Sequence, residues 1–332
     1  GGSNDGFMNI NQVPVQYLSM GSALLDQVPN PFFGLPANQG KSVTSPTIQR
    51  RELLRPFPQF DNIIMRQSTM GKSQYHAAVL KFEKRISNGW GGRVNYTYSN
   101  LKDNQFGESN FFSRNTTGML DVNNLEQEYT VGLLDVPHKI VIAPIVELPF
   151  GEGKRWANSG VAAAILGDWT FSSIVSIEAG FPISIATSNN TNIFTSMQRV
   201  NLTGSEQATS GSDHDRIAPP QGSGCITGQD CGAGLWLNRA AYSSPAAFTL
   251  GTSPRVDGSV RTPARNNWDF VANKAVRLKG SWRGEIRLEV LNLTNTVKVR
   301  GPINTLNSST FGQIRSQSGF MRLTQLAFRL SF

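Results

Sequence analysis

The sequence lacks any long apolar run and carries little charge. No stretch approaches the ~18–20 apolar residues that a membrane-spanning helix requires, and the most apolar candidate, Val161 to Leu166, is far too short. Charged residues make up 16% of the 332 residues, against about 25% in ordinary soluble domains. These values argue against transmembrane helices, and the length suffices for two ordinary domains or one large all-β unit.

Cysteine is scarce. Cys225 and Cys231 are the only two, in a stretch rich in Gly and Ser. Their spacing favours a disulfide within one loop, and hence an oxidising compartment. A metal site would need more ligands. Only Asp213, His214 and Asp215 are near, and zinc-type Cys/His spacing is absent.

Groups that would carry chemistry are few. The three histidines, His76, His138 and His214, have no neighbouring nucleophile or ligand set that completes a site. No Gly-rich phosphate loop is present. The net charge is +8, but Lys and Arg are scattered rather than clustered with aromatic residues. We therefore expect no enzyme activity, no cofactor, no bound metal and no nucleic-acid partner.

What the sequence does have is a repeated alternation of apolar and polar residues. The last such segment puts Leu326, Phe328, Leu330 and Phe332 on one strand face, and charge on the other. A strand of this kind needs an apolar medium on one side and water on the other, as in a membrane β-barrel. Seven segments follow the same pattern: residues 75–86, 90–101, 138–150, 169–186, 267–278, 282–294 and 320–332.

The polar faces of these predicted strands carry charges of both signs. In a membrane barrel these faces line the hydrated lumen. The lumen-facing candidates are Lys81, Glu83, Arg85, Arg93, Glu147, Glu178, Arg283, Glu285, Arg287, Glu289 and Arg329.

Connections between the strands alternate in length. Outer-membrane barrels have short periplasmic turns and longer extracellular loops, so the last strand should end at the periplasm. The short connections are residues 87–89, 151–168 and 279–281, and the long ones are 102–137, 187–266 and 295–319.

Aromatic residues support this orientation. Trp90, Trp169 and Trp282 each begin a strand after a short turn, and Phe150 and Phe332 each end one. Rings at these positions would lie at the periplasmic membrane interface. The outer interface would be marked by Tyr98, Phe181 and Trp268.

Two residues break the alternation. Lys274 falls on the apolar face of its strand, which could mark a subunit contact, a bulge or an error of register. Pro144 lies inside the third strand and cannot donate a ladder hydrogen bond. Residues 1–72 show no alternation and many prolines, and are predicted to form an irregular extracellular loop region, with a short helix at 15–28 and a hairpin within 60–69.

Several stretches resemble the C-terminal part of Oar-like TonB-dependent outer-membrane receptors. Together they span nearly the whole chain, although each alone is weak. They are N-I-N-Q-V-P-V-Q-Y-L-S-M-G (9–21), L-L-R-P-F-P-Q-F (53–60), Q-Y-H-A-A-V-L-K-F-E-K-R (74–85), V-P-H-K-I-V-I-A-P-I-V-E-L-P-F-G (136–151), R-L-E-V-L-N-L-T-N (287–295) and the closing A-F-R-L-S-F.

The resemblance implies a barrel of about 22 strands with a plug, a segment that contacts TonB, and an N-terminal carboxypeptidase-regulatory-like domain. Residues 73–332 would then form about the last third of the barrel, because an open edge in lipid leaves backbone groups unpaired. Residues 1–7 do not resemble a secretory leader, so we expect that a leader was removed or that the chain begins inside a longer protein. The terminal residues Leu326, Phe328, Leu330 and Phe332 resemble the signal read by the barrel-assembly machinery.

The function implied by the resemblance is energised uptake of a large substrate through a barrel in the outer membrane. Two other readings remain open at this point. The chain could be a structural or adhesive surface protein without transport, since long Gly- and Ser-rich loops suit that role. It could also be a soluble β-sandwich that binds carbohydrate.

Overall fold

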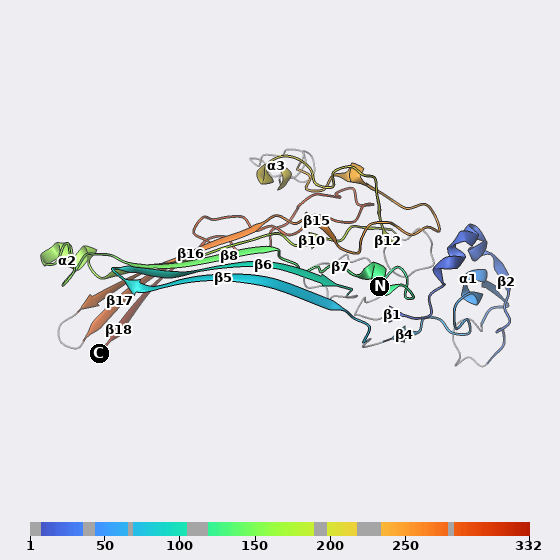
Figure 1. The fold of residues 1–332 in the computed structure, drawn as a ribbon, viewed down its shortest axis with the longest axis horizontal. Helices are drawn as coiled ribbons and strands as arrows, with labels where there is room; N and C mark the ends of the chain where they lie inside the picture. Colours follow the sequence, from blue (N-terminus) through green and yellow to red (C-terminus); the bar gives the residue numbers. More distant parts are fainter. Residues whose placement is uncertain are drawn as a thin grey trace.

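The structure is a computed structural model that describes residues 8–35, 44–65, 69–104, 119–188, 198–217, 234–277 and 282–332. Its dominant element is a sheet of seven long antiparallel strands, drawn nearly edge-on in Figure 1. The predicted disulfide partners Cys225 and Cys231 lie outside the described residues.

The seven long strands match the seven predicted segments, and each pairs with its neighbours in the chain. Their order is β18-β17-β16-β9-β8-β6-β5, with the two-residue strand β7 (Thr130–Val131) added at the end of β6. The predicted all-β, antiparallel fold is confirmed. The strands are β5 (Ser73–Ser87), β6 (Trp90–Asp103), β8 (His138–Glu147), β9 (Trp169–Glu178), β16 (Arg265–Arg277), β17 (Arg283–Leu291) and β18 (Leu323–Ser331).

The register unites the apolar sides of all seven strands into one surface, called here the apolar face. Because residues paired across antiparallel strands point to the same side, each lateral row can be followed through the pairing. One row crosses six strands without a polar residue: Trp90, Val146, Phe171, Ala272, Leu288 and Leu326.

Four of the predicted strands are too long by three residues or more; β17 ends at Leu291 instead of residue 294, and β18 begins at Leu323 instead of residue 320. β9 ends at Glu178 instead of residue 186, and β8 ends at Glu147 instead of residue 150. After β9 the backbone of Gly180 comes so close to Thr262 that a Cβ would lie 1.7 Å from its carbonyl oxygen. Phe181 therefore leaves the sheet, its N–H bonded to the Thr262 hydroxyl (2.9 Å), and it does not mark an interface on the wall.

Pro144 is accommodated within β8. It pairs with Gly92 of β6, whose φ is 153° and whose missing Cβ would lie 2.8 Å from the Ala143 carbonyl oxygen. Toward β9 the pairing skips residues 143 and 144 and resumes at Ile145. The proline is thus tolerated where a glycine permits close approach and where the ladder is interrupted.

Short and long connections lie at opposite ends of the sheet, as predicted; we call these the short-turn end and the long-loop end (Figure 1). The β5–β6 turn is the two-residue Asn88-Gly89 loop, with φ of 53° and 82°, as a type I′ hairpin requires. The β8–β9 connection carries the helix α2 (Gly160–Leu166). The C-terminus also lies at the short-turn end.

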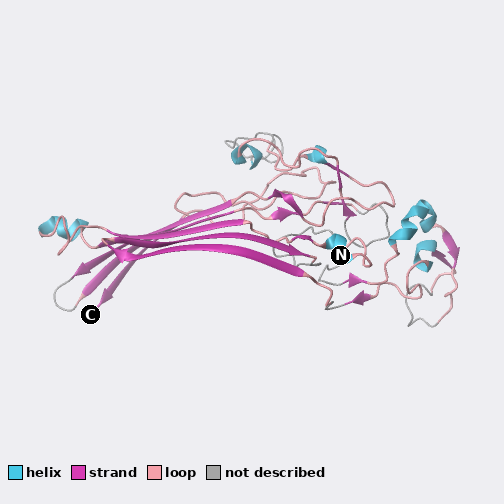
Figure 2. Ribbon diagram, viewed as in Figure 1, coloured by secondary structure: helices cyan, strands magenta, loops and turns pink. Residues whose placement is uncertain are grey.

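The described residues of the three long connections form what we call the loop body (119–137, 179–188, 198–217, 234–264 and 292–322). Figure 2 shows it as mostly loop with short strands. Its elements are η4 (Leu125–Glu128), β10 (Pro182–Ile183) paired with β15 (Asp257–Arg261), β11 (Ala186–Thr187) with β12 (Gln198–Arg199), β13 (Asn201–Leu202) with β14 (Tyr242–Ser243), α3 (Asp213–Ile217) and η5 (Arg239–Ala241).

The main hydrophobic core lies in the loop body, not in the sheet. It contains residues from the second and third long connections, and Trp236 anchors it by donating from Nε1 to the Arg261 carbonyl (2.6 Å). The core residues are Ile183, Ile185, Val200, Trp236, Leu237, Ala241, Tyr242, Val260, Leu306, Phe311 and Ile314.

The N-terminal segment, residues 8–65, lies beside the loop body at the long-loop end (Figure 1). The predicted helix at 15–28 is a 3₁₀ helix, η1 (Val15–Leu25), interrupted at Gly21, where φ is 56°. The predicted hairpin within 60–69 is wrong in its described part. β4 (Ile64–Met65) pairs with the distant β1 (Met8–Asn9). The other elements are β2 (Gln27–Pro29), β3 (Thr47–Gln49) and α1 (Arg50–Leu53).

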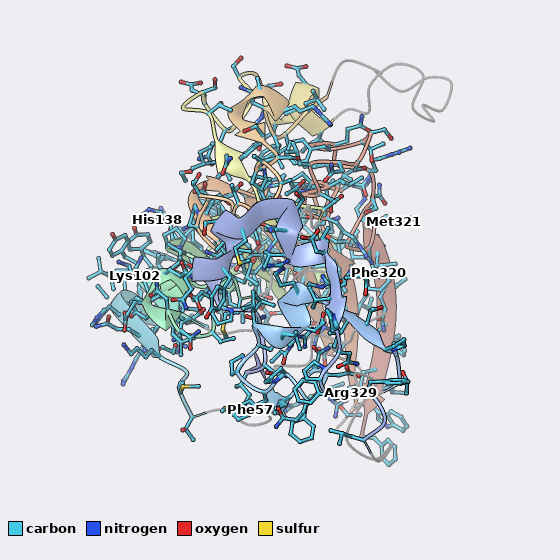
Figure 3. All side chains as sticks on the ribbon, turned by 90° about the vertical axis from the view of Figure 1, so that its right-hand side faces the viewer. Phe57, Lys102, His138, Phe320, Met321 and Arg329 are labelled. Atoms are coloured by element: carbon cyan, nitrogen blue, oxygen red, sulfur yellow. The ribbon has the colours of Figure 1, made fainter. Side chains whose placement is uncertain are left out.

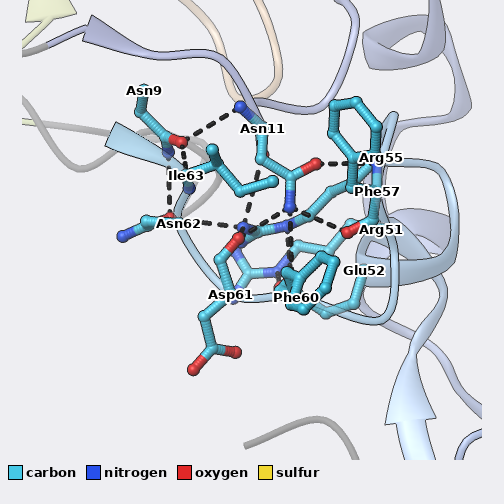
Figure 4. A network of polar contacts seen from close by, with 10 residues as sticks. All are labelled: Asn9, Asn11, Arg51, Glu52, Arg55, Phe57, Phe60, Asp61, Asn62 and Ile63. Atoms are coloured by element: carbon cyan, nitrogen blue, oxygen red, sulfur yellow. Dashed lines mark hydrogen bonds and ion pairs between the residues drawn. The ribbon is translucent and has the colours of Figure 1, made fainter. Parts of the chain in front are cut away.

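A buried asparagine holds this segment together (Figure 4). The Asn11 side chain is fully buried; its Nδ2 donates to the carbonyls of Phe57, Phe60 and Asp61 (2.9, 3.0 and 2.7 Å), and its Oδ1 accepts from the Phe57 N–H (2.9 Å). Arg55 donates to the Asn11 carbonyl (3.3 Å). Two of the stretches that carry the family resemblance, 9–21 and 53–60, therefore meet here.

Candidate functional site

The charged residues predicted to face a lumen share the side of the sheet opposite the apolar face, called here the charged face. The pairing places ten of the eleven there, and Arg85 falls at the register shift between Lys84 and Ser87. That this face lines a lumen remains a prediction. The ten are Lys81, Glu83, Arg93, Glu147, Glu178, Arg283, Glu285, Arg287, Glu289 and Arg329.

Ion pairs link neighbouring strands across the charged face. Arg93 lies 3.1 Å from Glu83 on β5. Glu178 of β9 contacts Lys139 of β8 (3.4 Å) and also Arg265 of β16. Sequence reasoning missed Lys139 and Arg265, although each lies within the first two residues of its strand and alternates with the apolar face. All of these pairs are partly exposed, so each adds at most about 1 kcal/mol, and their principal consequence is a hydrated, mixed-charge wall.

Aromatic residues mark both ends of the apolar face. At the short-turn end, Trp90 and Trp169 open β6 and β9, and the Trp282 ring packs 5.0 Å from that of Phe332. The predicted clustering of aromatic rings at this end is confirmed for these four. Phe150 does not end β8 as predicted; it lies beyond the strand, in the β8–β9 connection, and packs on Trp156 (5.7 Å).

The height of the apolar face fits a bilayer. Eight residues separate Trp90 from Tyr98 on β6, which is about 27 Å of strand at ~3.4 Å per residue. A tilt of ~40° reduces this to about 21 Å, close to the ~25 Å apolar band of outer-membrane barrels. Tyr98 and Trp268 remain exposed near the long-loop end of the apolar face, as predicted for the outer interface.

Lys274 lies on the apolar face in regular register, paired with Trp169 and Ile286. It therefore marks neither a bulge nor an error of register. Its side chain is buried, and Nζ donates to the carbonyl of Gly167, at the C-terminal end of α2 (2.6 Å).

Buried ion pairs join the first long connection to the second at the rim of the sheet. Arg199 pairs with Glu128, and both side chains are almost fully buried. Asp103, at the end of β6, pairs with the equally buried Arg255, which also donates to the Glu128 carbonyl (3.1 Å). Burying charge is costly unless it is paired, so these contacts fix one arrangement of the two connections.

A third pair completes this junction. Arg261 Nη2 lies 2.7 Å from the Asp135 carboxylate, and its Nη1 donates to the carbonyls of Asp135 and Gly180 (3.0 and 3.2 Å). The same carboxylate accepts from the Leu101 N–H on β6 (2.7 Å). These contacts tie the loop body to the ends of the strands, at the long-loop end of the sheet.

Burial also shifts the pKa of three groups in the loop body, Arg199, Arg216 and Tyr242. Desolvation lowers the pKa of Arg199, while the charge of Glu128 acts in the opposite direction. Desolvation raises the pKa of Tyr242, and the nearby carboxylate of Asp257 adds to that effect.

The N-terminal segment also packs against the loop body. Val13, Leu18 and Leu24 form a small core together with Phe248 and Leu250 of the second connection. Figure 3 looks at this end of the molecule, with Lys102 of β6 on one side and Met321, just before β18, on the other. The loop body and the N-terminal segment thus lie at the long-loop end, between the two edges of the sheet.

The histidines occupy separate positions. His138, at the start of β8, bonds through Nδ1 to the Tyr96 hydroxyl (2.9 Å) and packs against Tyr98 (5.3 Å between ring centroids). His76 lies on β5, and β6 separates that strand from the β8 strand of His138. Within the described residues, no group of three or more His, Cys, Asp and Glu could hold a metal ion.

A one-sided sheet with an apolar band, aromatic borders and a charged reverse face predicts an outer-membrane wall, and comparison with known families agrees. The sequence model described as an outer membrane beta barrel domain matches residues 3–325.

The chain belongs to this family of outer-membrane β-barrels.

Neither the curated proteins nor the solved structures contain a match to it. The family places the protein in the bacterial outer membrane. In the part of the chain that the structure describes, no helix is long and apolar enough to cross a membrane.

The sheet of this outer-membrane protein is open. In the described residues, β5 and β18 each pair on one side only, and both are exposed along their whole length apart from one residue of β5. Unpaired strand edges are not tolerated in lipid, so both edges require further strands in the assembled barrel.

Proposed function

We propose that this protein is a TonB-dependent receptor of the outer membrane, and that the chain forms the C-terminal part of its barrel. Its activity would be the energised uptake of a large substrate. The stretches that resemble Oar-like receptors support this identity, and they include residues 9–21 and 53–60, which meet around Asn11.

The observation that carries the proposal is the packed loop body at one end of the wall. The second and third long connections share a hydrophobic core, and a buried ion pair, Glu128–Arg199, joins the first connection to the second. Buried pairs such as Asp103–Arg255 fasten it to the rim. A fixed surface of this size suits recognition of a large ligand before it passes the barrel.

The charged face supports transport in a second way. Its ion pairs, such as Arg93–Glu83, are partly exposed, and mixed charges of this kind can be hydrated or contact a plug. We infer three further partners for the assembled receptor: TonB, through a segment preceding this chain; the barrel-assembly machinery, through the C-terminal strand; and membrane lipid, on the apolar face.

A labelling experiment in living cells tests the proposal without knowledge of the substrate. Glu285 faces the charged side of β17, so a cysteine there (Glu285→Cys) would be covered by a plug. A membrane-impermeant maleimide should label it faster when TonB and the proton-motive force are both present. A cysteine at the exposed loop position Ser205 (Ser205→Cys) should be labelled equally in cells with and without TonB.

Equal labelling of the cysteine at 285 with and without TonB would contradict energised transport. Together with retained surface exposure of the loop body, that result would instead fit a structural or adhesive protein. An uncoupler of the proton-motive force provides an independent check, because it should abolish the TonB-dependent difference within minutes.

A further inference from the structure

The helix α2 is an apolar element whose side chains are largely exposed. It reads G-V-A-A-A-I-L, and none of its residues is buried. Val161 and Ile165 are 74% and 61% exposed, and Leu166 and the preceding Trp156 are about half exposed. Leaving such side chains in water forfeits the hydrophobic gain that normally stabilises a short helix.

Two side chains of the apolar face determine on which side of the wall α2 lies. Trp169 and Lys274 are a directly opposed pair across β9 and β16. Trp169 Nε1 donates to the Ile165 carbonyl (2.9 Å), and Lys274 Nζ donates to the Gly167 carbonyl (2.6 Å). The C-terminal end of α2 is therefore held against the apolar side of the wall, not against the charged side.

The lysine suits this position chemically. An ammonium group at a helix C-terminus is favoured by the orphan carbonyls and the helix dipole. Nζ also lies 5.3 Å from the centroid of the Trp169 ring, within range of a cation–π contact. The lysine stem can remain among apolar groups while its charge is satisfied at the border of the membrane.

The backbone around α2 is fixed as well. A Cβ at Gly167 would lie 2.4 Å from the Ala163 carbonyl oxygen, so only glycine fits there. The following residue, Asp168, has a φ of 55° and accepts from the Ala275 N–H of β16 (3.2 Å). These contacts fix the connection on the strand ends. The exposure of its apolar side chains therefore belongs to a defined backbone conformation.

We propose that α2 lies in the periplasmic leaflet of the outer membrane and that phospholipid covers its exposed apolar side chains. The apolar face of the wall, which meets lipid in an outer-membrane protein, continues through Trp169 onto α2. Trp156, with the Arg155 guanidinium 5.3 Å from its ring, has the amphipathic character favoured at the headgroup level. At about 10 Å, α2 is too short to span the bilayer and lies along its surface.

This inference requires the membrane location and a periplasmic short-turn end, and it does not depend on TonB or on transport. It also explains why a lysine interrupts an otherwise apolar row. Lys274 ties an interfacial helix to the wall, which accounts for a lysine on the apolar face in regular register.

Fluorescence quenching on the native protein, purified from outer membranes, tests the proposal. Single cysteines at Val161 and Ile165, on a cysteine-free background, would carry a small fluorophore. The protein would be reconstituted in vesicles of phosphatidylethanolamine and phosphatidylglycerol that contain lipids spin-labelled near the headgroup. Controls would carry the label at Leu326, in the middle of the apolar face, and at Ser205, in the loop body.

Labels at 161 and 165 should be quenched by the spin-labelled lipid and protected from aqueous iodide. The label at Ser205 should show the reverse. Iodide quenching at 161 and 165 as strong as at 205 would overturn the proposal. Protection from both quenchers would overturn it too, because a protein partner would then cover the helix.

A second variant tests the tie itself. Lys274→Met should leave the barrel assembled but free the end of α2, so that a spin label at 165 becomes more mobile and its contact with lipid falls. Asn273→Ser, the neighbouring position on the charged face, should change neither. An unchanged spectrum in Lys274→Met would overturn the role given to this lysine.

Discussion

The carboxylate of Glu128 and the guanidinium of Arg199 are separated by 71 residues of sequence, yet they form an ion pair from which water is almost entirely excluded. Glu128 also accepts from the Leu120 N–H (3.1 Å), and its own carbonyl accepts from Arg255. This one residue therefore connects the first long connection to two separate arginines of the second.

Removing the charge of Glu128 should loosen the loop body. Glu128→Gln keeps the acceptor for Leu120 but leaves Arg199 charged and unpaired, which should cost about 3–5 kcal/mol. Limited proteolysis of the loop body in intact outer membranes would report this loss. Adding Arg199→Met should recover much of the stability, because it removes the uncompensated charge.

Glu126→Gln is the matched control for that experiment. Glu126 pairs with Lys72 at the surface, where an ion pair contributes at most about 1 kcal/mol. If Glu126→Gln and Glu128→Gln proved equally sensitive to protease, the buried pair would have no special role in the loop body.

Asn11→Asp should destabilise the N-terminal segment. The change removes both N–H donors of the side chain and places a carboxylate against the carbonyls of Phe57, Phe60 and Asp61. Each unsatisfied buried carbonyl costs about 1–3 kcal/mol, so amide hydrogen exchange should accelerate over residues 53–63. Ser19→Ala, which removes one exposed hydrogen bond to Gln16 in the same segment, should leave exchange unchanged. Equal exchange in Asn11→Asp and the wild type would refute the role of this network.

Leu288→Arg tests the identity of the apolar face. Leu288 lies mid-strand in the row between Ala272 and Leu326, and an arginine at this depth should cost about 2–4 kcal/mol in a bilayer. Unfolding of the reconstituted protein in urea would measure it. Gln325→Arg places the same residue on the charged face, opposite Glu289, and should be nearly neutral; equal costs at the two sites would mean that the faces are misassigned.

Phe332→Asp should impair assembly of the barrel. Phe332 is 89% exposed apart from its contact with Trp282, so the change affects recognition of the C-terminal strand more than folded-state packing. The amount of heat-modifiable barrel in the outer membrane should fall. Ser331→Asp, one residue earlier and on the opposite face, is the control and should assemble normally. Wild-type amounts of Phe332→Asp barrel would contradict an assembly signal at this terminus.

Tyr242 should be among the last tyrosines to ionise. Its pKa is raised in the folded state, so the folded protein retains a proton that the unfolded chain loses near its ordinary value of 10. The stability linked to this group is complete below about pH 10 and decreases above it. Tyrosinate absorbance near 295 nm should therefore show a late step that is absent from Tyr242→Phe. An identical titration of the two proteins would rule out this shift.

Residue alternation predicted the wall well. A strand's two faces are set by a period of two residues, which can be read locally. The positions of Trp90, Trp169 and Trp282 then identified the short-turn end. The same local rule extended β9 too far, because the turn at Gly180 depends on its contact with Thr262, which lies 82 residues later in the chain.

The loop body could not be predicted in this way. Its contacts join irregular segments, and nothing periodic links Glu128 to Arg199 or Asp103 to Arg255. The pairing of β4 with β1 was missed for the same reason. Two-residue strands carry too little pattern to reveal a partner more than fifty residues away.

The sequence by itself determined the seven strands, their two faces and their orientation relative to the turns, because burial in lipid acts on each strand separately. The tertiary structure alone decided what the remaining residues do. It brought together the buried charges that fix the loop body, and it placed the ammonium of Lys274 on the end of α2. Those contacts depend on where distant segments meet, which no local pattern encodes.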